Sequence, residues 1–140
     1  MAWNPCLAYF SGYVACAGLL LKGKFINLDV PIHLLNIYAP YSQRELFWDL
    51  VVLSGVLSLP NLIVAGDLNF TWSVEEVWGS CHAFDPLSGY FPSIFNNANL
   101  VDISPTNLSP TWSNGRCGAA RIAKQLDRYF MVESLCEIMG

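Results

Sequence analysis

One short run constrains this chain more than any other: residues 61–70 read Asn-Leu-Ile-Val-Ala-Gly-Asp-Leu-Asn-Phe. Its apolar half predicts a strand that ends at a glycine. Asp67 and Asn69 follow at i and i+2, which on extended backbone places their side chains on one side, roughly 6.5–7 Å apart. A carboxylate beside a neutral amide suits a water and a phosphate, or a metal ion and its ligand. The same residues also fit a strand running into a polar turn, because Gly, Asp and Asn are turn formers.

The composition predicts one domain with unusually apolar surfaces. The chain has 140 residues, 54% of them hydrophobic and 13% charged, and its mean hydropathy is +0.38. Either much of this apolar material is buried, or some surface lacks its partner. The net charge of −4 argues against a non-specific nucleic-acid binder, which needs a basic face. It does not exclude a metal-dependent nuclease, whose site is itself acidic.

The cysteines indicate an intracellular protein, nuclear or cytoplasmic. Their odd number and wide spacing, with no Cys-x-x-Cys pair, argue against structural zinc and a disulfide framework. We interpret them as reduced, semi-buried thiols; they are Cys6, Cys16, Cys81, Cys117 and Cys136. Cys81 beside His82 is a metal-ligand pair only if further partners join it.

The apolar segment 6–21 is interpreted as a buried strand pair joined by small residues. It is shorter than a membrane span and is interrupted by Ser11, Gly12 and Gly18. The N-terminus lacks the basic region of a signal peptide. Membrane association through this segment is the less favoured alternative.

The remaining pattern predicts alternating strands and helices. Segments 17–21 and 25–30 fit strands around a Lys22-Gly23-Lys24 turn, and 32–38 fits a strand stopped by Pro40. Ser42 and Glu45 form a capping-box pattern, with Tyr41 and Leu46 placed as a hydrophobic staple. The buried face expected for this helix comprises Leu46, Phe47, Leu50, Val51, Val52 and Leu57.

A strand, a helix and a second strand in this order predict a sheet covered by helices. Asp85-Pro86 is a good start for a second helix, which Pro92 should kink or interrupt. Segment 104–118 is rich in Ser, Pro, Asn and Gly and predicts a loop. Segment 125–132 predicts a last strand that carries Asp127.

Four polar residues at predicted strand ends suit one chemistry. Tyr38, Asp67, Asn69 and Asp127 offer a phenol, two carboxylates and an amide. With a hard divalent cation, such a set fits the hydrolysis of a phosphate ester. Each residue also has an ordinary alternative: Tyr38 as an edge aromatic with a satisfied hydroxyl, and Asp127 as a partner of Arg128 or Arg121.

Four motifs stand in the order found in a known superfamily: Asn-Ile-Tyr-Ala-Pro at 36–40, Gly-Asp-Leu-Asn-Phe at 66–70, Pro-Thr-Trp at 110–112 and Leu-Asp-Arg-Tyr-Phe at 126–130. Over residues 18–134 the chain resembles the endonuclease/exonuclease/phosphatase superfamily, most of all the endonuclease-like domains of plant non-LTR retrotransposons. The Gly-Asp-Leu-Asn string alone is a weak indication of this resemblance, whereas four motifs in the same order are a strong one.

The resemblance implies an α/β fold, a four-layer sandwich of two packed mixed sheets flanked by helices. It also implies phosphodiester hydrolysis with Mg²⁺ or Mn²⁺, and nucleic acid as the partner. By motif match, Asp67 orients the attacking water, with Asn69 as its partner and both near the metal. Tyr38 touches the phosphate, and Asp127 orients a catalytic histidine.

The chain departs from the superfamily pattern at both ends. We find no early Asn, no metal-binding Glu and no closing Ser-Asp-His motif. We therefore expect residues 1–140 to be a single truncated domain, incomplete at both termini, with little or no activity by itself. His33 and His82 do not stand in a context that replaces the histidine, and His33 is expected to be structural. The alternative function is a non-catalytic interaction module whose exposed apolar faces bind partners or a second copy.

Overall fold

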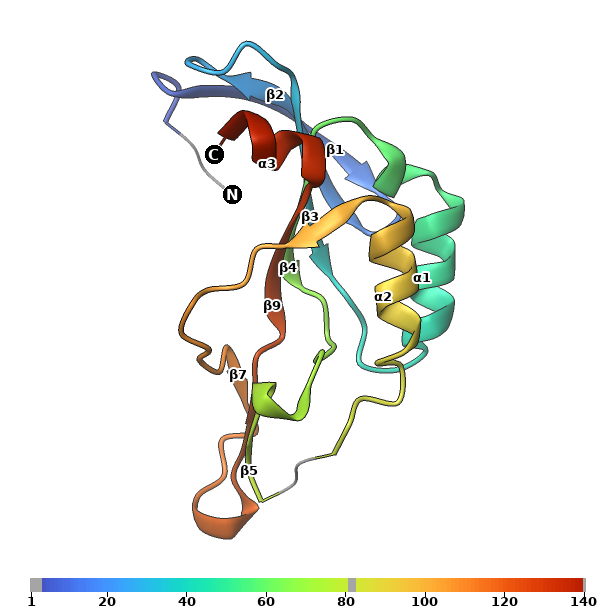
Figure 1. Cartoon of the computed structure of the whole chain (residues 1–140), viewed down its shortest axis with the longest axis vertical. Coiled ribbons are helices and arrows are strands. Elements are labelled where there is room, and N and C mark those ends of the chain that lie inside the picture. The colour runs from blue at the N-terminus through green and yellow to red at the C-terminus, as the bar shows by residue number, and fades with distance from the viewer. Residues whose placement is uncertain (1–3, 81–82, 140) are drawn as a thin grey trace.

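The computed structural model describes residues 4–80 and 83–139, which form two β-sheets and three α-helices (Figure 1). The larger sheet has the strand order β1 (Ala8–Ala15), β2 (Gly18–Phe25), β3 (Ile32–Tyr38), β4 (Leu62–Asp67), β9 (Asp127–Val132) and β6 (Leu100–Asp102). The smaller sheet has the order β5 (Val77–Gly79), β8 (Ile122–Lys124) and β7 (Trp112–Ser113). The helices are α1 (Arg44–Leu53), α2 (Tyr90–Asn97) and α3 (Glu133–Met139). The predicted α/β class with two sheets flanked by helices is confirmed.

The predicted strand–helix–strand unit is present. Strands β3 and β4 pair in parallel, with Tyr38 opposite Asp67, and α1 lies in the crossover between them. Strand β9 then pairs antiparallel with β4 on its other side. The three strands form the middle of the larger sheet, so their ends set the position of the polar residues discussed below.

The hairpin at the start of the chain differs from the prediction. Strands β1 and β2 pair around a turn at residues 16–17, and Lys22-Gly23-Lys24 lies inside β2. Gly23 serves close approach of the strands and not a turn, because a Cβ there would lie 1.7 Å from the Tyr9 carbonyl oxygen. Of the predicted strand at 25–30 only Phe25 lies in a strand, and residues 26–27 form a turn. The strand pair predicted within 6–21 is present, but β1 is mostly exposed, so the prediction that the pair is buried is wrong for this strand.

Helix α1 begins without the predicted capping box. Gln43 occupies the N-cap position in the left-handed region, at φ 55°, and makes no side-chain cap hydrogen bond. The buried side chains of α1 are Trp48 and Val51, whereas Leu46 and Leu50 are more than half exposed. The predicted face is confirmed for Val51 and Leu57, which are buried, and for Phe47, which packs against the core. It is wrong for Leu46, Leu50 and Val52, so the apolar face is narrower than predicted.

The second helix also starts later than predicted. Asp85 accepts the Leu87 N–H at 3.0 Å, closing a turn, and α2 begins at Tyr90. Pro92 is the third residue of α2. Its missing N–H falls in the first turn, where no intrahelical partner exists, so the predicted kink does not arise.

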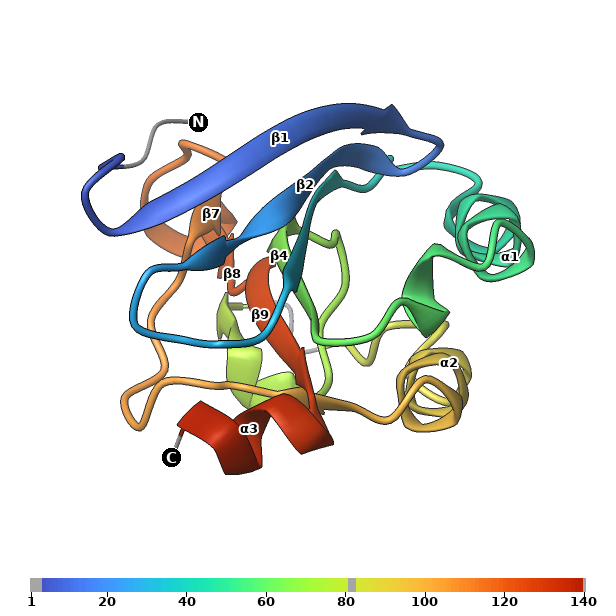
Figure 2. The ribbon, with the colours of Figure 1, turned by 90° about the horizontal axis from the view of Figure 1, so that it is seen from above.

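Helices α1 and α2 cover one face of the larger sheet (Figure 2). Their buried aromatic side chains join those of the sheet in one core. Phe70 stacks on Phe91 with centroids 4.0 Å apart, and Phe95 stacks on Phe130 at 4.1 Å. Trp48 meets three of these rings edge to face. Such pairs add about 0.5–1.5 kcal/mol each beyond area burial. This core fixes the β4 end, because Phe70 directly follows the Asp-Leu-Asn triplet.

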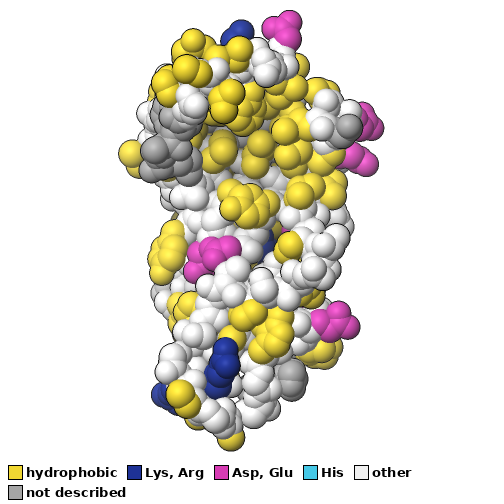
Figure 3. All heavy atoms as spheres, turned by 90° about the vertical axis from the view of Figure 1, so that its left-hand side faces the viewer, with side chains coloured by type: hydrophobic (Ala, Val, Ile, Leu, Met, Phe, Trp, Pro, Cys, Tyr) yellow, Lys and Arg dark blue, Asp and Glu magenta, His cyan; other side chains and the backbone are white. Residues whose placement is uncertain are grey.

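The other side of the molecule carries many exposed apolar side chains, which Figure 3 shows gathered over the upper part of one face. Val14 is 96% exposed and Tyr129 60% exposed. Cys6, Cys16 and Cys117 are also exposed, so the prediction of semi-buried thiols is wrong for them; Cys81 lies outside the described residues. Within residues 4–80 and 83–139, no helix is both long and apolar enough to cross a membrane.

Candidate active site

Three of the four predicted site residues are neighbours in the larger sheet. Tyr38 at the end of β3 lies opposite Asp67 at the end of β4, which in turn lies opposite Asp127 at the start of β9. Residues in register on adjacent strands point to the same face, with Cβ atoms about 4.5–5.5 Å apart in antiparallel pairs. The phenol and both carboxylates therefore share one sheet face at one sheet edge.

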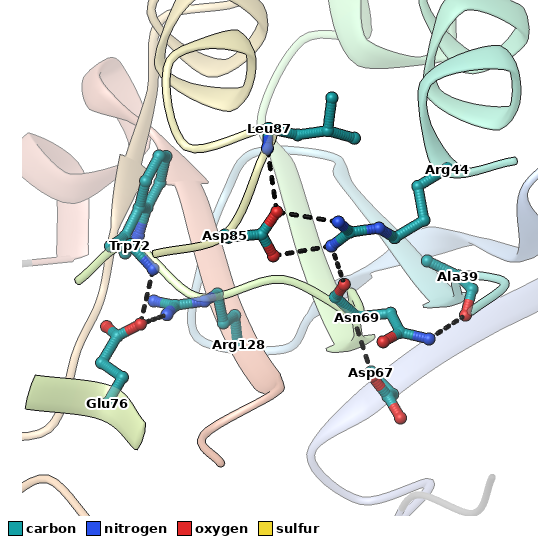
Figure 4. Close-up of polar contacts among 9 residues, drawn as sticks. All are labelled: Ala39, Arg44, Asp67, Asn69, Trp72, Glu76, Asp85, Leu87 and Arg128. Carbon is teal, nitrogen blue, oxygen red and sulfur yellow. Dashed lines mark hydrogen bonds and ion pairs between the residues drawn. The ribbon is translucent and has the colours of Figure 1, made fainter. Parts of the chain in front are cut away.

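Asn69 joins this group through a turn and not through extended backbone. Its φ is 55°, a left-handed conformation that asparagine tolerates. Its N–H donates to Asp67 Oδ1 at 3.0 Å, and its Nδ2 donates to the Ala39 carbonyl at 3.3 Å (Figure 4). The strand and turn interpretations of this segment are thus both correct: the strand ends at Asp67, and the turn places the backbone N–H of Asn69 against the Asp67 carboxylate.

A glycine makes this geometry possible. Gly66 has φ 128°, and a Cβ there would lie 2.1 Å from the Ile37 carbonyl oxygen. Glycine adopts such a conformation at little cost, whereas other residues are strained. The glycine of the motif is therefore required both for its backbone conformation and for the close approach of β3.

Asp67 has an unusual electrostatic environment. Partial burial raises the pKa of its carboxyl, the Asn69 N–H lowers it, and the charge of Asp127 raises it again, with a net shift upward. Asp127 has no ion-pair partner among the described residues, because Arg128 pairs with Glu76 and Asp102 instead. The alternative of an Asp127–Arg128 pair is therefore wrong. Two unneutralised carboxylates side by side form a site that favours a cation.

Two ion-pair networks hold the backbone around the site (Figure 4). Arg44 makes a bidentate pair with Asp85 at 2.6 and 2.8 Å, and it donates to the Asn69 carbonyl at 2.8 Å. Burial alone would raise the pKa of Asp85, but the Arg44 guanidinium lowers it below its usual value. Helix α1 is thereby tied to the turn that carries Asn69.

The second network is buried beneath β9. Arg128 is 2% exposed and pairs with Glu76 and with Asp102, the latter at 2.8 Å. Trp72 donates its backbone N–H to Glu76 and its indole N–H to Asp102, both at 2.6 Å. The network links the Glu76 turn, β6 and the β9 residue next to Asp127.

Thr111 connects two of the sequence motifs. Its hydroxyl oxygen accepts the backbone N–H groups of Leu126 and Asp127 at 2.9 and 3.0 Å. Leu126 in turn accepts the Leu68 N–H at 3.0 Å through its carbonyl. The threonine of Pro-Thr-Trp therefore positions the backbone that presents Asp127, a role that sequence reasoning missed.

A hollow of about 290 Å³ lies beside Tyr38, Asp67 and Asn69, and five of its eight lining residues were not predicted. Besides Tyr38, Asp67 and Asn69, it is lined by Tyr41, Trp112, Ile122, Lys124 and Leu126. Asp127 does not line this hollow and faces a separate one. Trp112 and Lys124 lie opposite each other on β7 and β8. Their presence follows from the smaller sheet, whose short strands have no clear signal in the sequence.

The donors fit a divalent cation only in part. Two carboxylates and an amide oxygen suit Mg²⁺ or Mn²⁺ that keeps most of its waters. No cluster of three or more His, Cys, Asp or Glu side chains suited to a metal occurs in the part of the chain that the structure describes. His33 is structural, as predicted, since its Nδ1 lies 2.7 Å from the Pro60 carbonyl oxygen, and His82 lies outside the described residues.

Comparison with solved structures supports the fold. The chain is similar to the endonuclease domain of TRAS1, a telomere-specific non-LTR retrotransposon, with a TM-score of 0.68 and 17% identity over 93% of this chain and 58% of that one. It is also similar to TDP2 of D. rerio, solved with a single strand DNA product, with a TM-score of 0.56 and 15% identity over 90% and 54%. At these identities the likeness shows a shared fold. No family model and no curated protein sequence matches the chain.

Proposed function

We propose that this chain is a metal-dependent phosphodiester hydrolase domain of the endonuclease type, with low activity by itself. One observation carries the proposal: Tyr38, Asp67 and Asp127 are in register on three adjacent strands, and Asn69 is folded back onto Asp67. The arrangement gathers the groups needed to hold a phosphate, a water and a cation. Because the chain spans 58% and 54% of the neighbours' lengths, their activities are only an argument by similarity.

Each side chain has a role that its contacts allow. Asp67 Oδ1 accepts the Asn69 N–H, which leaves Oδ2 to accept a hydrogen bond from the attacking water and orient it. One Nδ2 hydrogen of Asn69 is held by Ala39, and the other is available for a phosphate oxygen. Tyr38, 79% exposed, donates its hydroxyl to the same phosphate.

Asp67, Asn69 and Asp127 would hold the Mg²⁺ or Mn²⁺ ion. When bound, the ion supplies positive charge against the phosphate oxygens. Among the described residues, Asp67 and Asp127 are the only charged donors of this set. Affinity for the ion should therefore be weak, because hard cations are selected by ligand charge and number. Weak metal binding is the physical reason for the low activity that we expect.

Nucleic acid is the proposed substrate class, and a retrotransposon reading frame is the proposed origin. A neighbour with a non-LTR endonuclease domain and another solved with single strand DNA support this choice. The plant assignment rests on sequence motifs alone and stays a prediction.

A plasmid-nicking assay with Mg²⁺ or Mn²⁺ tests the proposal. We expect slow, EDTA-sensitive nicking that Asp67→Ala abolishes. Asp29→Ala is the matched control, since Asp29 is exposed on the segment after β2 and should leave the rate unchanged. No nicking at high protein concentration with Mn²⁺, or nicking that survives Asp67→Ala, would refute the hydrolase.

A non-catalytic interaction module is the second candidate, favoured by the exposed apolar side chains of Figure 3. Val14 on β1 is 96% exposed and Tyr129 on β9 is 60% exposed. Apolar side chains that gather on one exposed face mark a protein-interaction surface. Light scattering distinguishes the candidates: a folded, concentration-dependent oligomer without nicking activity supports the module, and an active monomer contradicts it.

A further inference from the structure

Three aromatic side chains surround the candidate active site, and all are accessible to solvent. Tyr38 is 79%, Tyr41 88% and Trp112 44% exposed, and each lines the 290 Å³ hollow with Asp67 and Asn69. They come from the end of β3, from the segment before α1, and from β7 of the smaller sheet. Grouped exposed rings next to a polar site mark a surface for a flat ligand.

One cation stands among these rings. Lys124 lines the hollow opposite Trp112, and no carboxylate pairs with it among residues 4–80 and 83–139. Arg44 lies nearby, but its charge is neutralised by Asp85. The hollow therefore presents one free ammonium, which is enough for one phosphate and too little for a long phosphate track.

We infer that Tyr41, Trp112 and Lys124 form a stacking platform for an unpaired nucleic-acid strand at the scissile phosphate. This inference rests on the proposed function and adds the form of the substrate to it. Bases of a single strand offer their faces to aromatic rings in any sequence, whereas the faces in an intact duplex are already stacked. An acidic protein cannot gain much affinity from phosphate neutralisation, so stacking must supply most of it.

The platform has a distinct salt signature. Each phosphate contact on a single strand contributes a slope of about −0.7 to log affinity against log salt. With Lys124 as the sole contact, affinity should fall about threefold between 50 and 200 mM salt. A basic groove with four contacts would lose about fiftyfold over the same range.

Fluorescence anisotropy in EDTA tests the platform separately from cleavage. The probes are a labelled 12-nucleotide oligothymidine, an oligouridine of the same length and a blunt 12-base-pair duplex. We expect both single strands to bind at least tenfold more tightly than the duplex. Tyr41→Ala and Trp112→Ala should each weaken single-strand binding about tenfold, and Tyr41→Phe should retain it because the ring remains.

Tyr9→Ala is the matched control, since Tyr9 is a 60% exposed tyrosine on β1 and does not line the hollow. Circular dichroism melts check that the variants are folded, as expected for exposed side chains. Tighter binding of the oligothymidine would identify DNA as the substrate, and tighter binding of the oligouridine would identify RNA. Either result supports the platform. Equal duplex binding, a steep salt slope, no binding or unaffected alanine variants would overturn it. If the protein binds single strands but does not nick the plasmid, the proposed hydrolase is refuted and the platform is still supported.

Discussion

Replacement of Arg128 by methionine tests how much the fold depends on its buried ion-pair network. The Arg128 side chain has no solvent exposure, and its guanidinium lies 5.0 Å from the centroid of Phe70 and 5.5 Å from that of Trp72. Methionine keeps most of the volume and removes the charge. The variant therefore reports on electrostatics more than on a cavity.

The expected loss of stability follows from the two carboxylates that lose their Arg128 partner. The Glu76 side chain is 6% exposed and would keep only the Trp72 N–H as a donor, whereas Asp102 is 19% exposed and can gain water. Removing one partner of a buried ion pair typically costs about 3–5 kcal/mol. Such a loss is a large share of the roughly 5–15 kcal/mol stability of a typical domain.

Urea unfolding followed by tryptophan fluorescence measures this loss. We expect Arg128→Met to lower the free energy of unfolding by about 3–5 kcal/mol, and Arg128→Met/Glu76→Gln to recover about 1–3 kcal/mol because it removes the orphaned charge. Arg121→Met, at an exposed arginine, should stay within about 0.5 kcal/mol of the parent. A loss below about 1 kcal/mol for Arg128→Met, or a double variant no more stable than the single one, would refute the reasoning.

Three further substitutions test the site. Gly66→Ala should cost at least about 2 kcal/mol in urea unfolding, because its Cβ would lie 2.1 Å from a β3 carbonyl oxygen, and Gly89→Ala, in open space, should cost far less. Thr111→Val should cost about 0.5–1.5 kcal/mol and reduce nicking, because two backbone N–H groups lose their acceptor, whereas the exposed Thr106→Val should do neither. Burial raises the pKa of the Asp67 carboxyl in the folded protein above its value in the unfolded protein. Ionisation of Asp67 therefore destabilises the fold at pH values above the folded-state pKa. Below the unfolded-state pKa the carboxyl is protonated in both states, so this effect is absent. Asp67→Asn should therefore raise the urea midpoint at about pH 7 and leave it unchanged at about pH 3; an equal effect at both would contradict this assignment.

The middle of the sheet could be predicted because its signals are local. The apolar runs that end at Tyr38 and Asp67 form β3 and β4, and a helix between two such strands makes a parallel pair. The polar residues at strand ends then share an edge. The local pattern predicts the strand that carries Asp127, but nothing local shows that β9 pairs with β4.

The elements that were predicted wrongly depend on contacts between residues far apart in the sequence. Ser42 and Glu45 match a capping box, but Gln43 turns the chain and the Arg44–Asp85 pair, 41 residues apart, anchors the helix start. Gly23 matches a turn, but the approach of Tyr9 across the sheet requires a residue without a side chain. Propensity was overridden in both cases by tertiary packing.

The lining of the hollow also depends on contacts between distant parts of the sequence. Trp112 and Lys124 are twelve residues apart in a stretch that favours a loop, and only the pairing of two very short strands sets them opposite each other. Composition gave no reason to group them with Tyr41. A site assembled from three separate segments therefore could not be predicted from the sequence.

The hairpin of β7 and β8 delivers Trp112 and Lys124 to the hollow from a sheet other than the one that holds Asp67 and Asp127. Its tip, residues 114–121, is exposed at most positions and lies beyond the two side chains that reach the hollow. Under the proposed function, the side chains that contact the strand and the acidic strand ends therefore come from separate sheets. Grafting a different hairpin between Thr111 and Leu126 offers a route to redirect the domain toward other targets while its acidic strand ends stay intact.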